Sequence, residues 1–314
     1  MDQAPGELDL ICADFNGALA LLRALGARLD SIYPADEPHS AVLSHDGTII
    51  RLWARADAPV APGTLPDFRP EFLVTVAGAA AAEGRAGMLY RDLIPSRLGG
   101  RYIASHIRID QGGPVGDWVH FHRIAVQLIC VRKGWVRVVY EDQGPPFVME
   151  AGDMVLQPPG IRHRVLDSGA GLEVVEITCP ALHETFAEHE MILPNGSAPG
   201  RSYGGQHFLH HVAATAPWTP WHGGEAQATG ISEASGALIE ARVVRLGAQA
   251  VVDVPPHEGE LVFGFVLEGS VRLGEGQPLG PADSFVVPPG KAWRLREASE
   301  DFRLLHVTTA LLPA

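Results

Sequence analysis

Hydrophobic and polar positions repeat with two different periods along the first fifty-seven residues. The stretch LDLICAD (residues 8–14) alternates like a β-strand, and leucines then recur every three or four residues from Leu19 to Leu29, as on one face of a helix. SAVLSHDGTIIRLWA (residues 40–54) has the pattern of two strands around a turn at residues 45–47. The pattern predicts a small βαββ segment over residues 1–57.

The rest of the chain has the pattern of a β protein. A proline-rich linker is predicted at residues 58–69, and short strands bounded by Gly and Pro follow from about Tyr90. Such spacing is typical of sandwiches and barrels. We expect one strand-rich domain over residues 70–185, a loop-rich connection over 186–235 and a second strand-rich domain over 236–314.

The two strand-rich domains look like copies of one another. GWVRVVYEDQ has a counterpart in GSVRLGEGQP, and VLQPPGIRH has one in FVVPPGKAW. Gly134 and Gly269 are 135 residues apart, whereas Pro158 and Pro288 are 130 apart. The difference predicts a shorter hairpin in the second copy, and a repeat of this length indicates a duplicated domain.

Composition excludes several classes of function. The chain has 314 residues, a formal net charge of −13 and an apolar fraction of 46%, which is ordinary for a globular protein. The negative charge argues against nucleic-acid binding and against docking on an anionic membrane. The expected partner is therefore a small-molecule substrate.

The cysteines and the N-terminal residues bear on the compartment. Cys12, Cys130 and Cys179 are odd in number and far apart, as expected of reduced thiols. MDQAPGELDL lacks the charged start and apolar core of a signal peptide, and runs such as residues 77–82 are too short to cross a bilayer. We expect a cytoplasmic protein.

Two histidines one residue apart, His120 and His122, raise the question of a metal site. In a strand they share one face. With 14 His in the chain, however, about 0.6 such pairs are expected by chance. GDMVLQPPGIRH (residues 152–163), with the spacing G-x5-P-x-G-x2-H, is more specific, because only about 0.01 matches are expected. Its Pro-Pro-Gly turn would bring His163 onto a neighbouring strand.

These two stretches together resemble the two signature motifs of the cupin superfamily of small jelly-roll β-barrels. The first motif, H-x-H followed by Glu and then Gly, is matched at His120, His122, Gln127 and Gly134, with Gln in place of Glu. The second supplies His163, with Asp167 where Asn is common. Pro114 stands where the first motif usually begins with Gly. The resemblance implies a mainly β bicupin, with two jelly-roll barrels preceded by the βαββ segment.

The cupin resemblance implies one divalent transition metal bound in the first barrel. Three neutral imidazoles suit Fe(II), Zn, Ni, Mn or Cu(II) and leave positions open for water or substrate. The alternative is three ordinary core histidines that bond to backbone groups. Gln127 occupies the fourth position, either as a ligand through its amide oxygen or as a hydrogen-bond partner of a bound water, and these readings remain equally open.

The neutral Gln127 bears on the reaction. Without Glu the metal would keep a charge close to that of the free ion and attract an anionic or enolisable substrate. Family members with three-histidine iron centres cleave carbon–carbon bonds or oxygenate thiols with O2. We therefore expect an Fe(II) dioxygenase acting on a small organic acid, aromatic or dicarbonyl compound. The alternatives are a redox-neutral isomerase, lyase or hydrolase with Zn, Ni or Mn, and a non-catalytic small-molecule sensor.

The second copy is degenerate at the same positions. His257 aligns with His122, but Pro255, Val262 and Trp293 stand at the other three positions. One imidazole cannot hold the metal, so we expect this barrel to be a structural partner.

Five further residues are candidates for the wall of the substrate pocket. Alternation places Trp118 on the face of His120, although a core position is equally compatible, and Ile129 and Val131 continue the face of Gln127. His106 and Arg108 share one face of a strand, where an inward arginine could clamp a carboxylate. A solvated outer face is the alternative for both.

The N-terminal segment resembles half of a vicinal oxygen chelate, or glyoxalase-like, module. In that family a ligand histidine commonly occurs in a pattern like LDHI, and Leu10 stands at that position here. We therefore expect a docking or dimerising unit rather than a second metal site. Together with the exposed edges of jelly-roll sheets, a half-module favours a homodimer.

Overall fold

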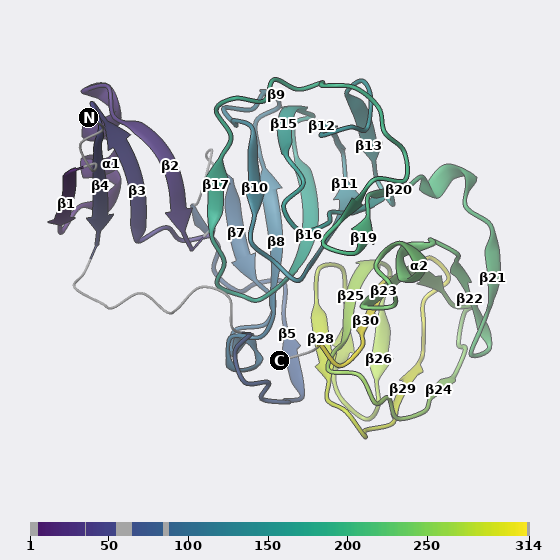
Figure 1. Ribbon diagram of the computed structural model, residues 1–314. Coiled ribbons are helices and arrows are strands. Elements are labelled where there is room, and N and C mark those ends of the chain that lie inside the picture. Colours follow the sequence, from purple (N-terminus) through teal and green to yellow (C-terminus); the bar gives the residue numbers. More distant parts are fainter. Residues whose placement is uncertain (1–5, 35, 55–64, 84–87, 313–314) are drawn as a thin grey trace.

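The computed structural model describes residues 6–34, 36–54, 65–83 and 88–312, which form an N-terminal unit and two β-barrels (Figure 1). The first part of the predicted linker, residues 58–64, lies outside the described residues. None of the described helices is long and apolar enough to cross a membrane. The three cysteines are free thiols.

The N-terminal unit is a four-stranded sheet with one helix. Its elements are β1 (Gly6–Ile11), α1 (Phe15–Ala24), β2 (Arg28–Tyr33), β3 (Ser40–His45) and β4 (Thr48–Trp53), in the sheet order β1-β4-β3-β2. The unit has one strand more than predicted. The helix ends at Ala24, because Gly26 takes a positive φ of 95°, and the leucine at position 29 belongs to β2.

The first barrel is built from two sheets. One, in the order β17-β10-β15-β12-β13, continues from β2 of the N-terminal unit, and the other has the order β20-β14-β11-β16-β8-β7-β6. Its elements are β6 (Ala82–Glu83), β7 (Leu89–Asp92), the 3-10 helix η2 (Arg97–Gly99), β8 (Ile103–Ile109), β9 (Gly113–Pro114), β10 (His120–His122), β11 (Val126–Lys133), β12 (Trp135–Tyr140), β13 (Phe147–Glu150), β14 (Met154–Leu156), β15 (His163–Ser168), β16 (Leu172–Cys179), β17 (Thr185–Ala187), β18 (Ser202–Tyr203), β19 (Gln206–His207), β20 (Leu209–His211) and the 3-10 helix η3 (Ala213–Thr215).

The second barrel repeats this plan with shorter strands. Its elements are β5 (Leu73–Thr75), β21 (Trp218–Trp221), β22 (Gly224–Gln227), α2 (Ile231–Ala234), β23 (Ile239–Arg245), β24 (Val252–Val254), β25 (Val262–Glu268), β26 (Val271–Leu273), β27 (Pro278–Leu279), β28 (Ser284–Val287), β29 (Trp293–Arg296) and β30 (Arg303–Thr309). Gly134 and Gly269 turn equivalent hairpins with φ of 79° and 66°. The next hairpin is shorter in the second barrel, as the repeat predicts.

Strand pairing divides the chain differently from the predicted boundaries. β5 lies within the range assigned to the first barrel, but it pairs with β28 of the second. In the range expected to be a loop-rich connection, β20 extends a sheet of the first barrel, whereas β21 and β22 extend a sheet of the second. These short strands were not recognisable locally, because each is defined by the sheet edge to which it pairs.

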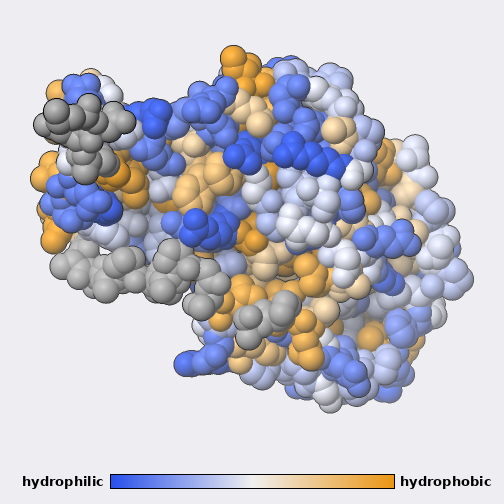
Figure 2. Space-filling view, in the orientation of Figure 1, coloured by the Kyte–Doolittle hydropathy of each residue, from blue (hydrophilic) through white to orange (hydrophobic). Residues whose placement is uncertain are grey.

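The two barrels share one hydrophobic core. Leu128 and Cys130 face outward from the first barrel and belong to the same buried cluster as Phe263 and Phe265 of the second. Each barrel therefore buries an outer sheet face as well as its own interior. Elsewhere hydrophilic and hydrophobic residues are interspersed on the visible surface (Figure 2).

A buried ion pair joins the barrels at the edge of this shared core. Arg101 donates from Nε and Nη2 to both carboxylate oxygens of Glu260, at 2.9 and 2.6 Å. The Tyr102 hydroxyl donates to the same carboxylate at 2.8 Å, and Arg101 also donates to the carbonyl of Leu312. The hydrogen bond with Glu260 raises the pKa of Arg101, so the guanidinium stays charged.

We predict that Glu260→Gln lowers the free energy of unfolding by roughly 3 kcal/mol, because it leaves the buried Arg101 guanidinium without a counter-charge. Denaturant unfolding followed by tryptophan fluorescence measures the change. Asp167→Asn, which removes the partner of the half-exposed Arg137, is the control and should cost less than about 1 kcal/mol. Equal losses of unfolding free energy in the two variants would contradict a stabilising role for the buried Arg101–Glu260 ion pair.

Candidate metal centre

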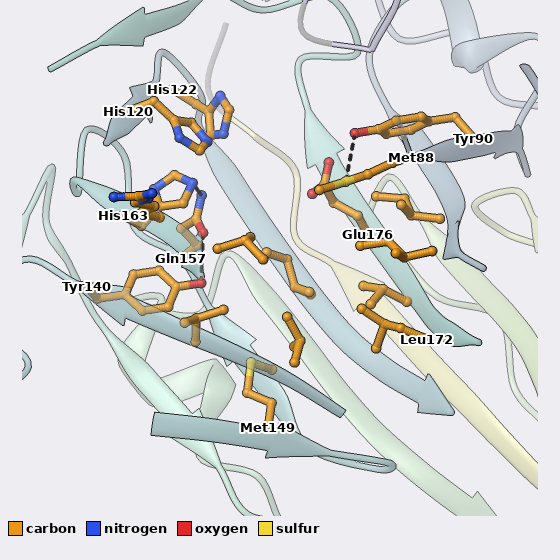
Figure 3. Close-up of a pocket in the computed structure, with 18 residues that line it drawn as sticks. Met88, Tyr90, His120, His122, Tyr140, Met149, Gln157, His163, Leu172 and Glu176 are labelled. Atoms are coloured by element: carbon orange, nitrogen blue, oxygen red, sulfur yellow. Dashed lines mark hydrogen bonds between the residues drawn. The ribbon is translucent and has the colours of Figure 1, made fainter. Parts of the chain in front are cut away.

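The structure brings the three predicted histidines together inside the first barrel (Figure 3). β10 pairs with β15 so that His120 stands directly opposite His163, and His122 follows two residues later on the same face. Their ligand nitrogen atoms all lie within 4.8 Å of one another. All three side chains are buried, with exposed fractions of 0, 6 and 6%.

Hydrogen bonds at Nδ1 fix the orientation of each ring. Nδ1 of His120 lies 2.7 Å from the carbonyl oxygen of Trp118, and Nδ1 of His163 lies 3.1 Å from that of Ile161. Because a carbonyl only accepts, both rings carry their proton on Nδ1 and keep the lone pair on Nε2. Nδ1 of His122 lies 2.9 Å from the hydroxyl of Thr185, which holds the third ring in the same way.

This donor set fits a divalent transition metal. Neutral imidazoles whose second nitrogen bonds to a protein oxygen are the usual ligands of Fe, Zn, Ni, Mn and Cu sites. Within the described residues, no other group of three His, Cys, Asp or Glu side chains comes together in this way. The three histidines could therefore hold one metal ion through Nε2.

Two glutamine amides lie beside the histidines. Gln157 Nε2 lies 3.2 Å from His163 Nε2 and donates to Gln127 Oε1 at 2.5 Å. The Tyr140 hydroxyl donates to Gln157 Oε1 at 3.0 Å. Burial, with the Glu176 carboxylate as a smaller cause, raises the pKa of Tyr140, so its phenol remains a donor. Gln127, predicted at the fourth position, therefore accepts a hydrogen bond from Gln157, and Gln157 is the residue that contacts His163.

A cavity of about 90 Å³ opens beside the three rings. This is several times the roughly 10–15 Å³ that one water molecule needs. Its wall is mainly apolar, and its polar groups outside the histidines are few. The lining includes Met88, Ile107, Ile109, Ile129, Val136, Val138, Met149, Leu172, Val174, Tyr90, Tyr140, Gln157, Arg164 and Glu176. An apolar cavity with a few convergent polar groups is the usual form of a small-molecule site.

Among the residues predicted for the pocket wall, the structure places one in the lining of this cavity. Ile129 lines the cavity, whereas Val131 is fully buried in the packing around it. Trp118 contacts the edge of the His120 ring, at a centroid distance of 5.1 Å, and packs against the core of the N-terminal unit. It does not line the cavity.

His106 and Arg108 do not face the metal site. On β8, Ile107 and Ile109 line the cavity, so the alternating His106 and Arg108 lie on the opposite face of the sheet. Burial is the main reason that the pKa of His106 falls to about 4. These two residues, predicted for the pocket wall, therefore do not line the cavity beside the three histidines.

Sequence reasoning missed Gln157, Tyr140 and Glu176. A signal existed for Gln157, because Val155 of β14 packs inside the barrel and the second residue along a strand faces the same way. Tyr140 and Glu176 come from β12 and β16, far apart in sequence, and only closure of the barrel brings them to one cavity.

The second barrel lacks the ligand set. Gly290 N donates to the carbonyl of His257 as Gly160 N does to that of His122, so these histidines occupy equivalent positions. His257, however, lies with Nε2 3.0 Å from the carbonyl of Val287. Trp293, equivalent to His163, stacks on the buried His306. Aromatic and aliphatic side chains together fill the interior of this barrel.

Comparisons with known proteins agree with this architecture. No protein-family model matches the sequence, and no curated protein sequence is significantly similar to it. Among solved structures, the chain is similar to oxalate decarboxylase from Bacillus subtilis at pH 4.6, with TM-score 0.56, 13% identity and coverage of 79% of this chain and 77% of that one. A structure from work on the Mn(II) centres of the same enzyme gives TM-score 0.56, 13% identity and coverage of 80% and 79%. The chain therefore has a bicupin fold.

We predict that protein purified without chelator or affinity nickel carries about one equivalent of metal, and that His163→Ala loses it because two imidazoles remain. His257→Ala, at the equivalent position to His122 in the second barrel, should keep the metal. Elemental analysis by mass spectrometry measures both. Metal retained in His163→Ala, or absent from all samples, would refute the site.

We predict that Thr185→Val lowers metal affinity by roughly 10- to 100-fold, because the His122 ring loses the hydroxyl that holds Nδ1. Thr185→Ser keeps a hydroxyl and should bind close to wild type. Competition with a chromogenic chelator gives the affinities. If the valine and serine variants bind alike, the hydroxyl does not position the ring.

Proposed function

We propose that the first barrel holds one divalent transition metal through His120, His122 and His163, and that the protein is a metal-dependent enzyme acting on a small organic anion. The observation that carries this proposal is a buried set of three imidazoles, with their ligand nitrogen atoms within 4.8 Å of one another, beside a cavity. Imidazole ligands and the amides of Gln157 and Gln127 carry no negative charge, so none of them would offset the charge of a bound ion. An anionic substrate would do so.

The protein residues bind and orient the substrate. The apolar wall formed by residues such as Ile129, Val138 and Leu172 keeps bulk water out and strengthens the attraction between an anion and the centre. The Tyr140 phenol and the Gln157 amide form a fixed pair of polar groups at one side of the cavity. The bound metal would supply Lewis acidity or, as Fe(II), access to O2.

For the reaction we favour O2-dependent cleavage of a small organic acid, aromatic or dicarbonyl compound by an Fe(II) form. A substrate that enters as an anion needs no general base from the protein. The donor set supports this proposal, because it contains only neutral ligands and leaves coordination positions open.

A specific observation favours a second candidate, a redox-neutral lyase or isomerase. The Glu176 carboxyl group lies in the cavity across from the histidines (Figure 3) and could transfer a proton to or from a substrate. The similar solved structures are of oxalate decarboxylase, one of them from work on its Mn(II) centres. Mn(II) and a carboxylic acid substrate are therefore included in the test.

The two candidates differ in O2 consumption and in their need for Glu176. We predict that Fe(II)-loaded protein consumes O2 in proportion to substrate loss when small carboxylic acids and dicarbonyls are screened, and that Glu176→Gln keeps most of this activity. An oxygen electrode with chromatography of the substrate measures both. His163→Ala is the control for the metal.

Turnover without O2 uptake, supported by Mn(II) and lowered roughly 100-fold or more by Glu176→Gln, would replace the oxygenase proposal with the lyase. Binding of an anion without any turnover would leave a sensor and contradict both enzymatic candidates.

A further inference from the structure

A second cavity, which we call the seam cavity, lies between the two barrels and outside the metal site. Its volume is about 210 Å³, and its lining includes Arg91, His106, Arg108, Arg132, Glu173 and Ala282. One wall is the outer face of the first barrel. The other is formed by residues 77–81, which connect β5 to β6, and by the turn before β28 of the second barrel.

Three arginines converge on this cavity because of strand register. Arg91 on β7 pairs with His106 on β8, and Arg108 on β8 pairs with Glu173 on β16. Arg132 on the next strand, β11, reaches Glu173 through Nη1. The outer face of this sheet of the first barrel has two parts. Residues packed against the second barrel, such as Leu128 and Cys130, are apolar, whereas those that line the seam cavity are mostly charged.

Arg91 is held by both walls of the cavity. Its Nη2 donates to the carbonyl of Ala282 at 2.7 Å, and its Nη1 donates to the carbonyl of Val76 at 3.1 Å. The side chain is 4% exposed, and burial lowers its pKa, with the charges of Arg132 and Arg108 as smaller contributions. The guanidinium is therefore fixed in position.

The cavity has more positive than negative charge. Glu173 is shared, because it accepts from Arg132 and lies 2.9 Å from Nε2 of His106. Nε of Arg132 is buried without a hydrogen-bond partner. No ion pair to Arg108 occurs among the residues that the structure describes. Asp283, whose charge acts to raise the pKa of Arg91, accepts from two backbone amides at 2.7 and 2.8 Å. In a chain of net charge −13, this local excess of positive charge is a distinct feature.

We propose that the seam cavity binds a small oxyanion group, a carboxylate or a phosphate, between Arg91, Arg108 and Arg132. Guanidinium groups match the geometry of both anions. Arg91 is buried and held in position, Arg132 is half-buried, and the exposed Arg108 can move to meet the anion. The anion would satisfy Arg132 Nε and relieve the repulsion among the three arginines. It would also link the barrels, since Arg91 already bonds to the second one.

The test uses inorganic phosphate and succinate as separate probes in calorimetric titrations at low ionic strength. The titrations are made in the His163→Ala background as well as in the wild type, so that an anion bound at the metal centre is not counted. In His163→Ala we predict one site per chain for at least one probe, and the tighter probe identifies the anion class. The wild type should show the same site in addition to any anion bound at the metal centre. Binding raises the melting temperature.

Arg108→Ala should weaken this binding by about tenfold or more, because it removes a charge-assisted contact. Arg108 is exposed, so its loss leaves the core intact. Arg137→Ala is the matched control, because it removes one positive charge from a part of the first barrel that does not line the seam cavity. This variant should bind the anion as tightly as the protein without the substitution.

Absence of binding by both probes at millimolar concentration would overturn the proposal, as would equal weakening by Arg108→Ala and Arg137→Ala. The proposal does not rest on the metal-dependent function, because the His163→Ala background removes that site. Absence of turnover in the metal-loaded wild type, together with anion binding in His163→Ala, would therefore count against the metal enzyme alone.

Discussion

The pairing of β10 with β15 is the constraint on which the metal centre depends. This register places His120 opposite His163, and the two-residue period of a strand then places His122 on the same inner face. A slip of one residue would turn the histidines of β10 toward the outside of the barrel. The Nδ1 contact of His122 depends on the pairing on the other side of β10, because Thr185 lies opposite His122 on β17.

The two barrels show how one scaffold gives a cavity in one copy and a filled core in the other. In the second barrel Trp293, Phe285, Trp221 and His306 occupy the interior in mutual ring contact. Large aromatic side chains remove the space that a substrate needs. The outer face of that barrel is still required, because its residues complete the core that both barrels share. Loss of the ligands therefore left a structural function intact.

The sequence was informative wherever the geometry is local. His-x-His on a strand and a Pro-Pro-Gly turn before His163 fix relative orientations over a few residues, and these predictions identified the cluster. The alternation of residues along a strand also predicted that His106 and Arg108 share a face, and they do. Alternation does not indicate which face of the strand points into the barrel, because this depends on how the sheet closes. Glu176 was missed for the same reason, since its place in the cavity depends on strands distant in sequence.

The two cavities lie on opposite faces of one sheet, and this separation decides how their ligands can be tested. β8 presents Ile107 and Ile109 to the metal-site cavity and His106 and Arg108 to the seam cavity. The inner cavity is mainly apolar, and Arg164 and Glu176 are the charged side chains in its lining. The outer cavity is lined by three guanidinium groups and needs no metal to attract an anion. Anion binding that persists without metal and is weakened by Arg108→Ala therefore identifies the seam cavity, whereas binding that requires the metal and His163 identifies the cavity inside the barrel.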